Sequence, residues 1–198
     1  QYSCFLGRIL RGEFGTSYIT ERPILDDLLM KAPYTFSLAL VAIIIAVIGG
    51  VFLGIISAIK RNSIWDKLAV LLSVVGVSAP VFWVALILIL FFSIELNLLP
   101  PSGYGQWYFI ILPAIALGTR SFALFTRITR TNFIEIITED YMITAKAKGL
   151  SSYVVILKHG LKNLMIPLIT VIGLDFSSYL TGAVLTESIF GWPGLGRY

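Results

Sequence analysis

The chain alternates long apolar stretches with short polar ones, and this pattern predicts helices that cross a membrane. Two stretches, Phe36 to Ile59 and Leu68 to Ile94, contain no charged residue. About 20 apolar residues are enough for a helix to span the hydrocarbon core of a bilayer. The sequence therefore predicts an integral membrane protein. Its first span is expected from about Pro33 to Ile59, and its second over Leu68 to Ile94.

Two further spans are predicted in the second half of the chain, and each contains one charged residue. The third begins at the aromatic residues 107–109, contains Arg120 and ends near Thr126. The fourth runs from about Leu164 to Leu185 and contains Asp175. Together the four spans predict an all-α, polytopic bundle of transmembrane helices. Pro80 is expected to kink the second span near the middle of the membrane, because proline removes a backbone hydrogen bond.

The first 32 residues have a different character, because charges alternate there with short apolar runs. We expect residues 1–32 to form a segment at the outer membrane interface, with a short helix over Ile24 to Lys31 that begins after Pro23. Residues 33–198 are expected to form the transmembrane domain, with the cytoplasmic loop 127–163. At its end, Glu187 and the sequence Trp192-Pro193-Gly194 are expected to form an outer turn with the tryptophan at the interface.

The distribution of basic residues predicts which side of the membrane each loop occupies. The loops 60–67 and 127–163 together hold nine Lys and Arg, whereas the loop 95–106 holds none. Short loops rich in Lys and Arg stay in the cytoplasm. The N-terminal segment carries four basic residues and conflicts mildly with this orientation. The two basic loops directly flank predicted spans, so they determine the predicted orientation.

Composition excludes several other functions. The chain is 57% hydrophobic and 13% charged, outside the usual range of soluble domains. With one cysteine, Cys4, and one histidine, His159, it lacks the residues for an internal disulfide or a Cys/His zinc cluster, and we predict no metal site. His159 is expected as a polar residue at the inner interface. The basic charges follow membrane topology, so no nucleic-acid function is predicted. The sequence Gly103-x-Gly105 lacks the Lys-Ser/Thr of an ATP site.

The loop 127–163 carries the main candidate for function. Residues 141–148 have helical spacing and are followed by Gly149, a typical helix stop. A second helix is expected to begin near Ser151 or Ser152, either of which could cap it. The small residues Ala145 and Ala147 would let a partner approach closely. The pattern indicates a docking surface on the cytoplasmic side.

This segment, with the sequence DYMITAKAKGL followed by KHGLKNLMIPLIT, resembles the cytoplasmic coupling loop (EAA loop) of ABC-importer permeases of the peptide/nickel class. The stretches GEFGTSYITERPILDDLL, GVSAPVFWVALILILFFS, LLPPSGYG, ILPAIALG and TESIFGWPGLGRY also look like that class and follow in the same order. Ile143 and Thr144 stand where Glu and Ala are often found in the general loop pattern. That departure is usual in the peptide/nickel class.

The resemblance implies a type I permease with six spans, two of which would lie before residue 1 and after Tyr198. It implies two ATP-binding cassette subunits, which bind the ATP and Mg, so no cofactor and no enzymatic activity are expected in this chain. It further implies a second, related permease subunit in a heterodimer, an extracytoplasmic substrate-binding protein and surrounding lipid. The location would be the cytoplasmic (inner) membrane of a bacterium or archaeon.

In permeases of this type the short helix of the loop sits in a groove of the ATPase subunit. The resemblance assigns that coupling function to residues of one continuous segment, namely Glu139, Asp140, Tyr141, Thr144, Ala145, Lys146, Ala147, Lys148, Gly149 and Leu150.

Arg120, Asp175 and Pro80 are candidates for the translocation path, a role that the resemblance itself does not assign. Charged residues inside spans usually face a bundle interior or a water-filled path. With a rise of about 1.5 Å per residue, the depths of Arg120 and Asp175 differ by only about 6 Å. We hypothesise a salt bridge or a shared lining of the path, with a purely structural pair as the alternative.

Three functions were compared. The first is a permease subunit that forms half of the pathway for peptides, nickel or metal chelates and couples to ATPases through residues 139–149. The second is a self-contained secondary transporter or channel that uses Asp175 and Arg120. The third, a membrane-embedded enzyme, lacks a convergent acid–base or metal set. Peptide and nickel members share these motifs, so both substrates stay open.

Overall fold

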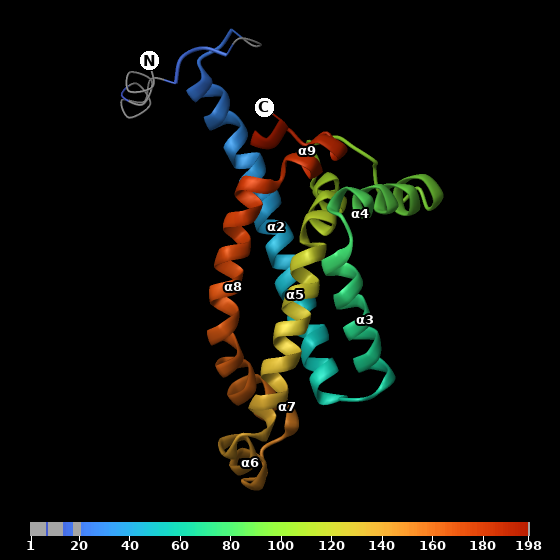
Figure 1. The fold of residues 1–198 in the computed structure, drawn as a ribbon, viewed down its shortest axis with the longest axis vertical. Helices are drawn as coiled ribbons and strands as arrows, with labels where there is room; N and C mark the ends of the chain where they lie inside the picture. Colours follow the sequence, from blue (N-terminus) through green and yellow to red (C-terminus); the bar gives the residue numbers. More distant parts are fainter. Residues whose placement is uncertain (1–6, 8–13, 18–20, 198) are drawn as a thin grey trace.

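The computed structural model describes residues 7, 14–17 and 21–197, and its regular structure there is helical apart from one isolated bridge between Thr16 and Pro23. Three long helices stand side by side: α2 (Ile24–Ile59), α5 (Ile111–Thr138) and α8 (Leu161–Gly182). The start of α2 and the 3-10 turn η4 (Leu195–Arg197) lie at one end of this bundle, which we call the outer end after the predicted orientation, and α6 (Asp140–Ala147) lies at the other, inner end (Figure 1). Three helices are long and apolar enough to cross a membrane, or four if a sharply bent pair counts as one span.

Helix α2 is a single helix of 36 residues with Pro33 inside it. The predicted division into a short helix over Ile24 to Lys31 and a span from Pro33 is therefore wrong. Proline removes one hydrogen bond, but α2 packs along α5 and α8, and those contacts keep the helix continuous. Most of the predicted interfacial segment, residues 1–6, 8–13 and 18–20, lies outside the described residues.

Helices α2 and α5 pack with their backbones in close approach. A Cβ atom added at Gly50 would lie 2.8 Å from the carbonyl oxygen of Phe122, and one at Gly118 would lie 2.9 Å from the carbonyl oxygen of Ala42. Side chains at these positions would separate the helices. Small residues at such positions are typical of closely packed transmembrane helices.

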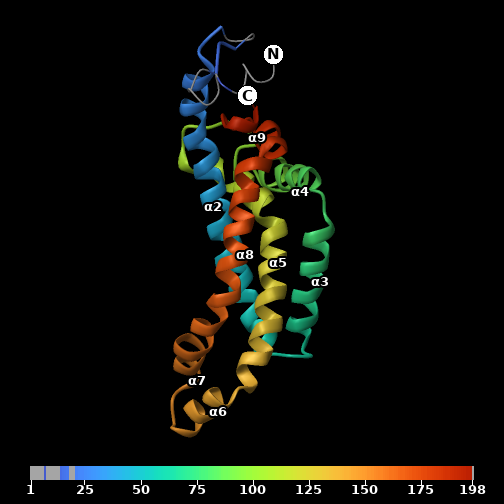
Figure 2. The same cartoon turned by 60° about the vertical axis from the view of Figure 1, so that its left-hand side comes forward.

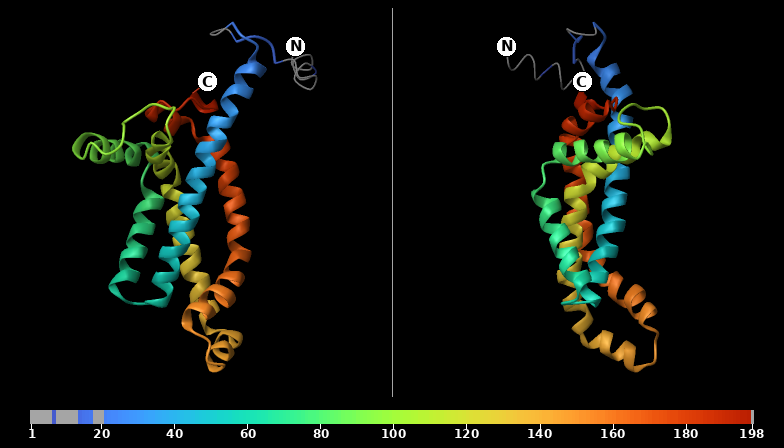
Figure 3. Two further views of the ribbon diagram at one scale, coloured as in Figure 1. Left: turned by 180° about the vertical axis from the view of Figure 1, so that it is seen from behind. Right: turned by 90° about the vertical axis from the view of Figure 1, so that its right-hand side faces the viewer.

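The second predicted span is broken rather than kinked. Helix α3 (Ile64–Ser78) ends before Pro80, and α4 (Val81–Leu88), continued by the π-helix η1 (Ile89–Glu95), departs at 112°. Ala79 has an extended backbone, as expected for a residue before proline. The α4–η1 arm lies across the outer end of the bundle (Figure 3). The expectation that Pro80 only kinks a helix that continues over Leu68 to Ile94 is wrong, because the helix breaks there.

Helix α5 begins after a 3-10 turn, η2 (Trp107–Ile110), and extends well beyond the predicted end at Thr126. Arg120 does not interrupt it. Outside the hydrocarbon a helix needs no apolar side chains, and the residues that follow Thr126 are compatible with helix.

The rest of the chain continues from the inner to the outer end. Helix α6 (Asp140–Ala147) is followed by α7 (Ser152–Val154), the π-helix η3 (Val155–Gly160) and α8. The last three elements continue one another without a break and form one rod, from which α6 is separate (Figure 2). Beyond α8 lie α9 (Val184–Phe190) and η4 (Leu195–Arg197). Ser151 precedes α7 without a side-chain capping hydrogen bond, so the predicted serine cap is not formed.

Candidate functional site

Residues 139–160, which we call the coupling unit, form the inner end of the bundle, the end predicted to face the cytoplasm (Figure 1). Glu139 is extended and precedes α6, and Lys148 follows that helix. Gly149 then adopts a positive φ of 78°, a conformation that favours glycine. Asp140 in the first turn and Lys146 in the last turn both complement the helix dipole. The predicted helix and its glycine stop are confirmed.

The coupling unit rests on its own chain through a small apolar cluster. Met142 and Ala145 are buried and pack against Val155 of η3 and Ile136 of α5. The Nδ2 of Asn163 in α8 donates a hydrogen bond of 2.8 Å to the Tyr141 hydroxyl. Helix α6 therefore touches both α5 and the rod that contains α8.

Most of the residues assigned to coupling are exposed, but Ala145 is not. Its side chain is 5% exposed and faces the apolar cluster, so it seats α6 on the chain itself. The assignment of Ala145 to the docking face is corrected. Ile143, which was left out of the assignment, is 56% exposed. The exposed face of the unit comprises Glu139, Asp140, Tyr141, Ile143, Thr144, Lys146, Ala147, Lys148, Gly149 and Leu150.

Near the inner end an ion pair fastens α3 to α5. Arg130 donates from Nε to Asp66 Oδ1 at 2.6 Å and from Nη2 to Asp66 Oδ2 at 2.9 Å. Asp66 also accepts from the Ser57 hydroxyl at 2.5 Å and from the Asn62 backbone N–H at 2.9 Å. We call this group the inner lock. The sequence does not predict the inner lock, because its paired charges lie 64 residues apart and no local pattern relates them.

At the outer end a buried carboxylate fastens the C-terminal segment to α2. Glu187 is 0% exposed. Its Oε1 accepts from the Thr35 hydroxyl at 2.6 Å, and its Oε2 accepts from the Gly196 backbone N–H at 2.7 Å. The Leu195 backbone N–H donates to Thr35 Oγ1 at 2.8 Å. We call Thr35, Glu187 and residues 192–197 the outer clamp.

Close packing of backbone completes the outer clamp. A Cβ atom added at Gly194 would collide with the Glu187 carboxylate, and one at Gly196 would lie 2.6 Å from Val184 Cα. The Trp192 Nε1 donates to the Tyr34 carbonyl at 3.0 Å. The expectation that Glu187 belongs to the outer turn is wrong. It lies in α9, and the turn follows at Gly191, with a φ of 65°.

The third group of polar residues consists of Arg120 on α5 and Asp175 on α8. Within the described part of the chain, the hypothesised salt bridge between Arg120 and Asp175 is not formed. Arg120 is exposed, while Asp175 is half-buried and its Oδ2 is buried without a hydrogen-bond partner. Pro80 does not join them, because it lies at the α3–α4 elbow on the other side of α5 (Figure 1).

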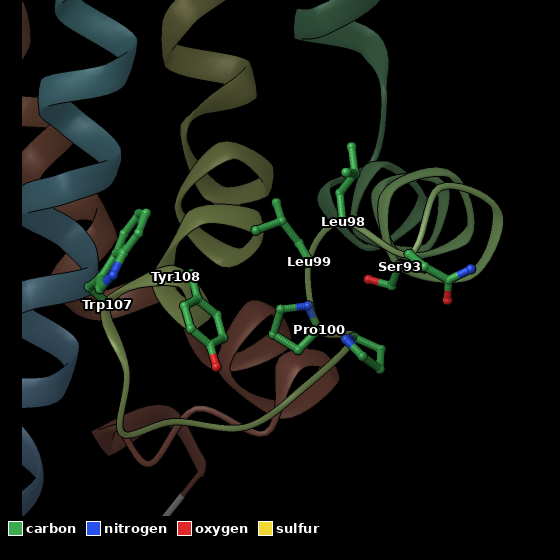
Figure 4. Close-up of a pocket in the computed structure, with 8 residues that line it drawn as sticks. Ser93, Leu98, Leu99, Pro100, Trp107 and Tyr108 are labelled. Atoms are coloured by element: carbon green, nitrogen blue, oxygen red, sulfur yellow. The ribbon is translucent and has the colours of Figure 1, made fainter.

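An open cavity of about 580 Å³ lies at the outer end, between η1 and the start of α5 (Figure 4). Its lining carries no charge and consists of Ser93, Asn97, Leu98, Leu99, Pro100, Pro101, Trp107 and Tyr108. The buried Ser93 hydroxyl has no hydrogen-bond partner among the described residues. The cavity is thus an uncharged surface with both apolar and polar groups, at the end opposite the coupling unit.

The chain was compared with known proteins. A family model described as "Binding-protein-dependent transport system inner membrane component" matches residues 50–198. Glutathione transport system permease proteins from Pectobacterium atrosepticum and from Escherichia coli K12 are 42% and 41% identical over 197 residues. These alignments cover 100% of this chain and 64% of each relative, so the chain spans less than two thirds of their length.

A solved structure titled as an amino acid ABC transporter with histidines shares the fold. Its TM-score is 0.65 at 16% sequence identity, with 93% of this chain and 81% of that chain covered. This likeness confirms the all-α membrane architecture.

Proposed function

The chain belongs to the family of binding-protein-dependent transport system inner membrane components, and from this membership we propose that it is the transmembrane permease subunit of an ATP-driven importer. The observation that carries the proposal is the coupling unit. A short helix, α6, lies between the inner ends of two long apolar helices, and its exposed face carries Lys146 and is followed by Lys148. Such a helix suits a partner that pushes on it.

Contacts of α6 suggest how motion of a partner would reach the membrane. Met142 and Ala145 connect α6 to α5 through Ile136 and to the α8 rod through Val155. The hydrogen bond from Asn163 to Tyr141 adds a second connection to α8. A displacement of α6 would therefore act on both α5, which carries Arg120, and α8, which carries Asp175. Two ATP-binding cassette subunits would supply it, because binding of ATP can bias one conformational state over another.

The remaining partners follow from the same assignment. A second, related permease subunit would complete the pathway, and an extracytoplasmic binding protein would deliver the cargo to the outer end. The basic inner loops support a coupling unit on the cytoplasmic side. The cytoplasmic membrane of a bacterium or archaeon is the location that we propose for the chain. The residues that meet the ATPase are those of the exposed face of the coupling unit.

Short peptides are the cargo that we propose. The similar proteins named as glutathione permeases support it, since glutathione is a tripeptide. Nickel or a metal chelate is the second candidate, because members that carry metals share the motifs of the coupling loop. A self-contained transporter that uses Arg120 and Asp175 is the competing function.

Co-purification of the full-length protein with candidate ATPase subunits tests the proposal. We would replace Ile143 by Glu and Ala147 by Trp, both on the exposed face, and use Trp65→Ala as a control. Trp65 is 54% exposed and also lies near the inner end, but outside the coupling unit. We expect the double variant to insert in the membrane and lose the ATPases, while the control retains them.

Unchanged binding by the double variant would place the docking surface elsewhere. A wild-type protein that binds no ATPase and still transports cargo in vesicles would favour the self-contained transporter.

A further inference from the structure

Helices α3 and α5 lie side by side, and a cavity of about 480 Å³ lies between them (Figure 2). We call this cavity the α3–α5 groove. Its lining contains two arginines and no carboxylate, and it consists of Val70, Ser73, Val74, Val77, Ser78, Arg127, Arg130 and Thr131. Arg127 and Arg130 are three residues apart, so they are neighbours on one face of α5. The groove is therefore positively charged.

The two arginines differ in their partners. Arg130 uses two of the five N–H donors of a guanidinium to bind Asp66 in the inner lock, and its other donors remain for a second acceptor. Arg127 is exposed and makes no ion pair within the described part of the chain. One positive charge of the groove thus has no counter-charge among those residues.

An apolar cavity continues the groove toward the elbow between α3 and α4. It has a volume of about 430 Å³ and shares Val74 and Ser78 with the groove. The rest of its lining is Val75, Ala79, Pro80, Phe82 and Trp83. The two cavities together form one surface that is cationic beside the inner lock and apolar at the elbow.

The depth of this surface matches one leaflet of a bilayer. Arg127 lies about 24 Å along α5 from Ile111 at 1.5 Å per residue. In a hydrocarbon core of about 30 Å, that position is near the inner boundary, where a long arginine side chain reaches the headgroups. The elbow begins about 12 Å beyond Val70 along α3, and the hydrocarbon of one leaflet is about 15 Å deep.

We propose that the α3–α5 groove binds an anionic phospholipid of the inner leaflet. The phosphodiester accepts hydrogen bonds from Arg127 and from the remaining donors of Arg130. One acyl chain lies along Val74 in the apolar cavity. Basic pockets between transmembrane helices on the cytoplasmic side bind such headgroups. Lipid binding here goes beyond the proposed function and does not depend on the ATPase partners.

The apolar cavity favours a lipid over a soluble anion. A free phosphate or a peptide carboxylate could pair with the arginines, but it would leave the exposed side chains around Val74 and Trp83 bare. A phospholipid carries the anionic group and the acyl chain in one molecule, so it fills both cavities. The outer cavity near Ser93 has no charge in its lining and offers no such pairing.

Native mass spectrometry of the full-length protein tests the proposal. The probes are phosphatidylglycerol and phosphatidylcholine with identical acyl chains, which differ in net charge because choline neutralises the phosphate. We expect the wild type to bind phosphatidylglycerol about fivefold more tightly, the usual contribution of one arginine beside an anionic lipid. Arg127→Gln should abolish this preference and leave phosphatidylcholine binding unchanged. Arg127→Lys keeps the charge and should retain part of the preference.

Two control variants accompany the test. Arg61→Gln removes the same charge from an exposed position of the inner loop outside the groove, and it should keep the preference. Val74→Trp fills the junction of the two cavities and should weaken both lipids equally. Its control is Leu71→Trp, at a position that is 57% exposed and lines neither cavity, which should bind both lipids as the wild type does.

Four results would overturn the proposal. The first is equal affinity of the wild type for the two lipids. The second is the same loss in Arg61→Gln as in Arg127→Gln, which would indicate diffuse surface charge. The third is displacement of phosphatidylglycerol by inorganic phosphate or by N-acetyl-trialanine, which would make a soluble anion the occupant.

The fourth result is loss of the lipid when the second permease subunit is present, which would mean that the partner covers the groove. Co-purification with the ATPases is read separately. A protein that binds the ATPases without a lipid preference would leave the proposed function intact.

Discussion

The two ends of the bundle are held by different kinds of contact. At the outer clamp a fully buried carboxylate accepts hydrogen bonds from α2 and from the C-terminal backbone. Glycines there allow close packing of the C-terminal segment against α9. The coupling unit at the inner end rests on a few apolar side chains and one exposed side-chain hydrogen bond. Hydrogen bonds such as those of the outer clamp weaken when their atoms shift out of line, because they depend on distance and angle. Apolar contacts such as those of the coupling unit have no preferred direction, so they tolerate small displacements.

This difference indicates a division of mechanical roles. Protein segments with few buried contacts open locally at low cost, while well-packed segments open only with the whole fold. We therefore expect the outer clamp to move as part of α2 and α9, and the coupling unit to move relative to α5. The following changes test this contrast.

The largest effect is expected from Gly196→Leu. Its Cβ would lie 2.6 Å from Val184 Cα, so backbone would have to move and the clamp would open. Overpacking of this kind costs about 3 kcal/mol of unfolding free energy. Thermal unfolding in detergent measures it. The control is Gly173→Ala in α8, where nothing lies within 4 Å of the added Cβ. Equal stability of the two variants would refute the close contact.

A somewhat smaller loss is expected from Glu187→Ala. The Thr35 hydroxyl and the Gly196 N–H would lose their acceptor, at a cost of about 2 kcal/mol. Glu187→Gln keeps an acceptor and the shape, so it should lose less. The same unfolding assay compares them. A variant Glu187→Ala as stable as wild type would show that the clamp does not hold the outer end.

The inner lock should contribute less than the outer clamp. Arg130 is 26% exposed, so water screens its attraction to Asp66. A double-mutant cycle with Asp66→Asn and Arg130→Met should give a coupling energy of about 1 kcal/mol. A coupling energy near zero would mean that the two residues act independently.

The smallest effect on global unfolding is expected from Met142→Ala. Met142 is 1% exposed, yet the apolar cluster to which it belongs contains only residues of the coupling unit and Ile136 of α5. We expect a global change of about 0.5 kcal/mol or less, with faster amide hydrogen exchange in residues 140–160. Hydrogen exchange read by mass spectrometry measures both. A global loss as large as that of Glu187→Ala would show that the coupling unit unfolds only with the bundle.

Local patterns predicted some features of this structure well. The apolar run before Ile59 predicts the inner end of α2, and the spacing of residues 141–148 followed by Gly149 predicts α6 and its stop. These features depend on neighbours within one or two turns. The strength of the bend at Pro80 was not predictable, because a proline kink and a break share the same local signal.

Features that depend on long-range contacts were missed. Thr35 and Glu187 lie 152 residues apart, and nothing near either residue indicates the other. Arg120 and Asp175 lie on α5 and α8, and their similar predicted depths did not reveal that no salt bridge joins them in the described part of the chain. Ala145 was assigned to the wrong face of α6, because the sequence does not reveal which side of a short helix meets its own chain.

The elbow at Pro80 has a consequence for the surrounding bilayer. Helix α3 has 15 residues and is about 22 Å long, which is shorter than the hydrocarbon core of about 30 Å. The α4–η1 arm turns sideways and exposes Phe82, Trp83 and Phe91. Lipids beside α3 would therefore be compressed toward the arm, and the cost of that hydrophobic mismatch rises with acyl-chain length. The thickness of the surrounding bilayer would therefore affect the energy of this protein in its membrane.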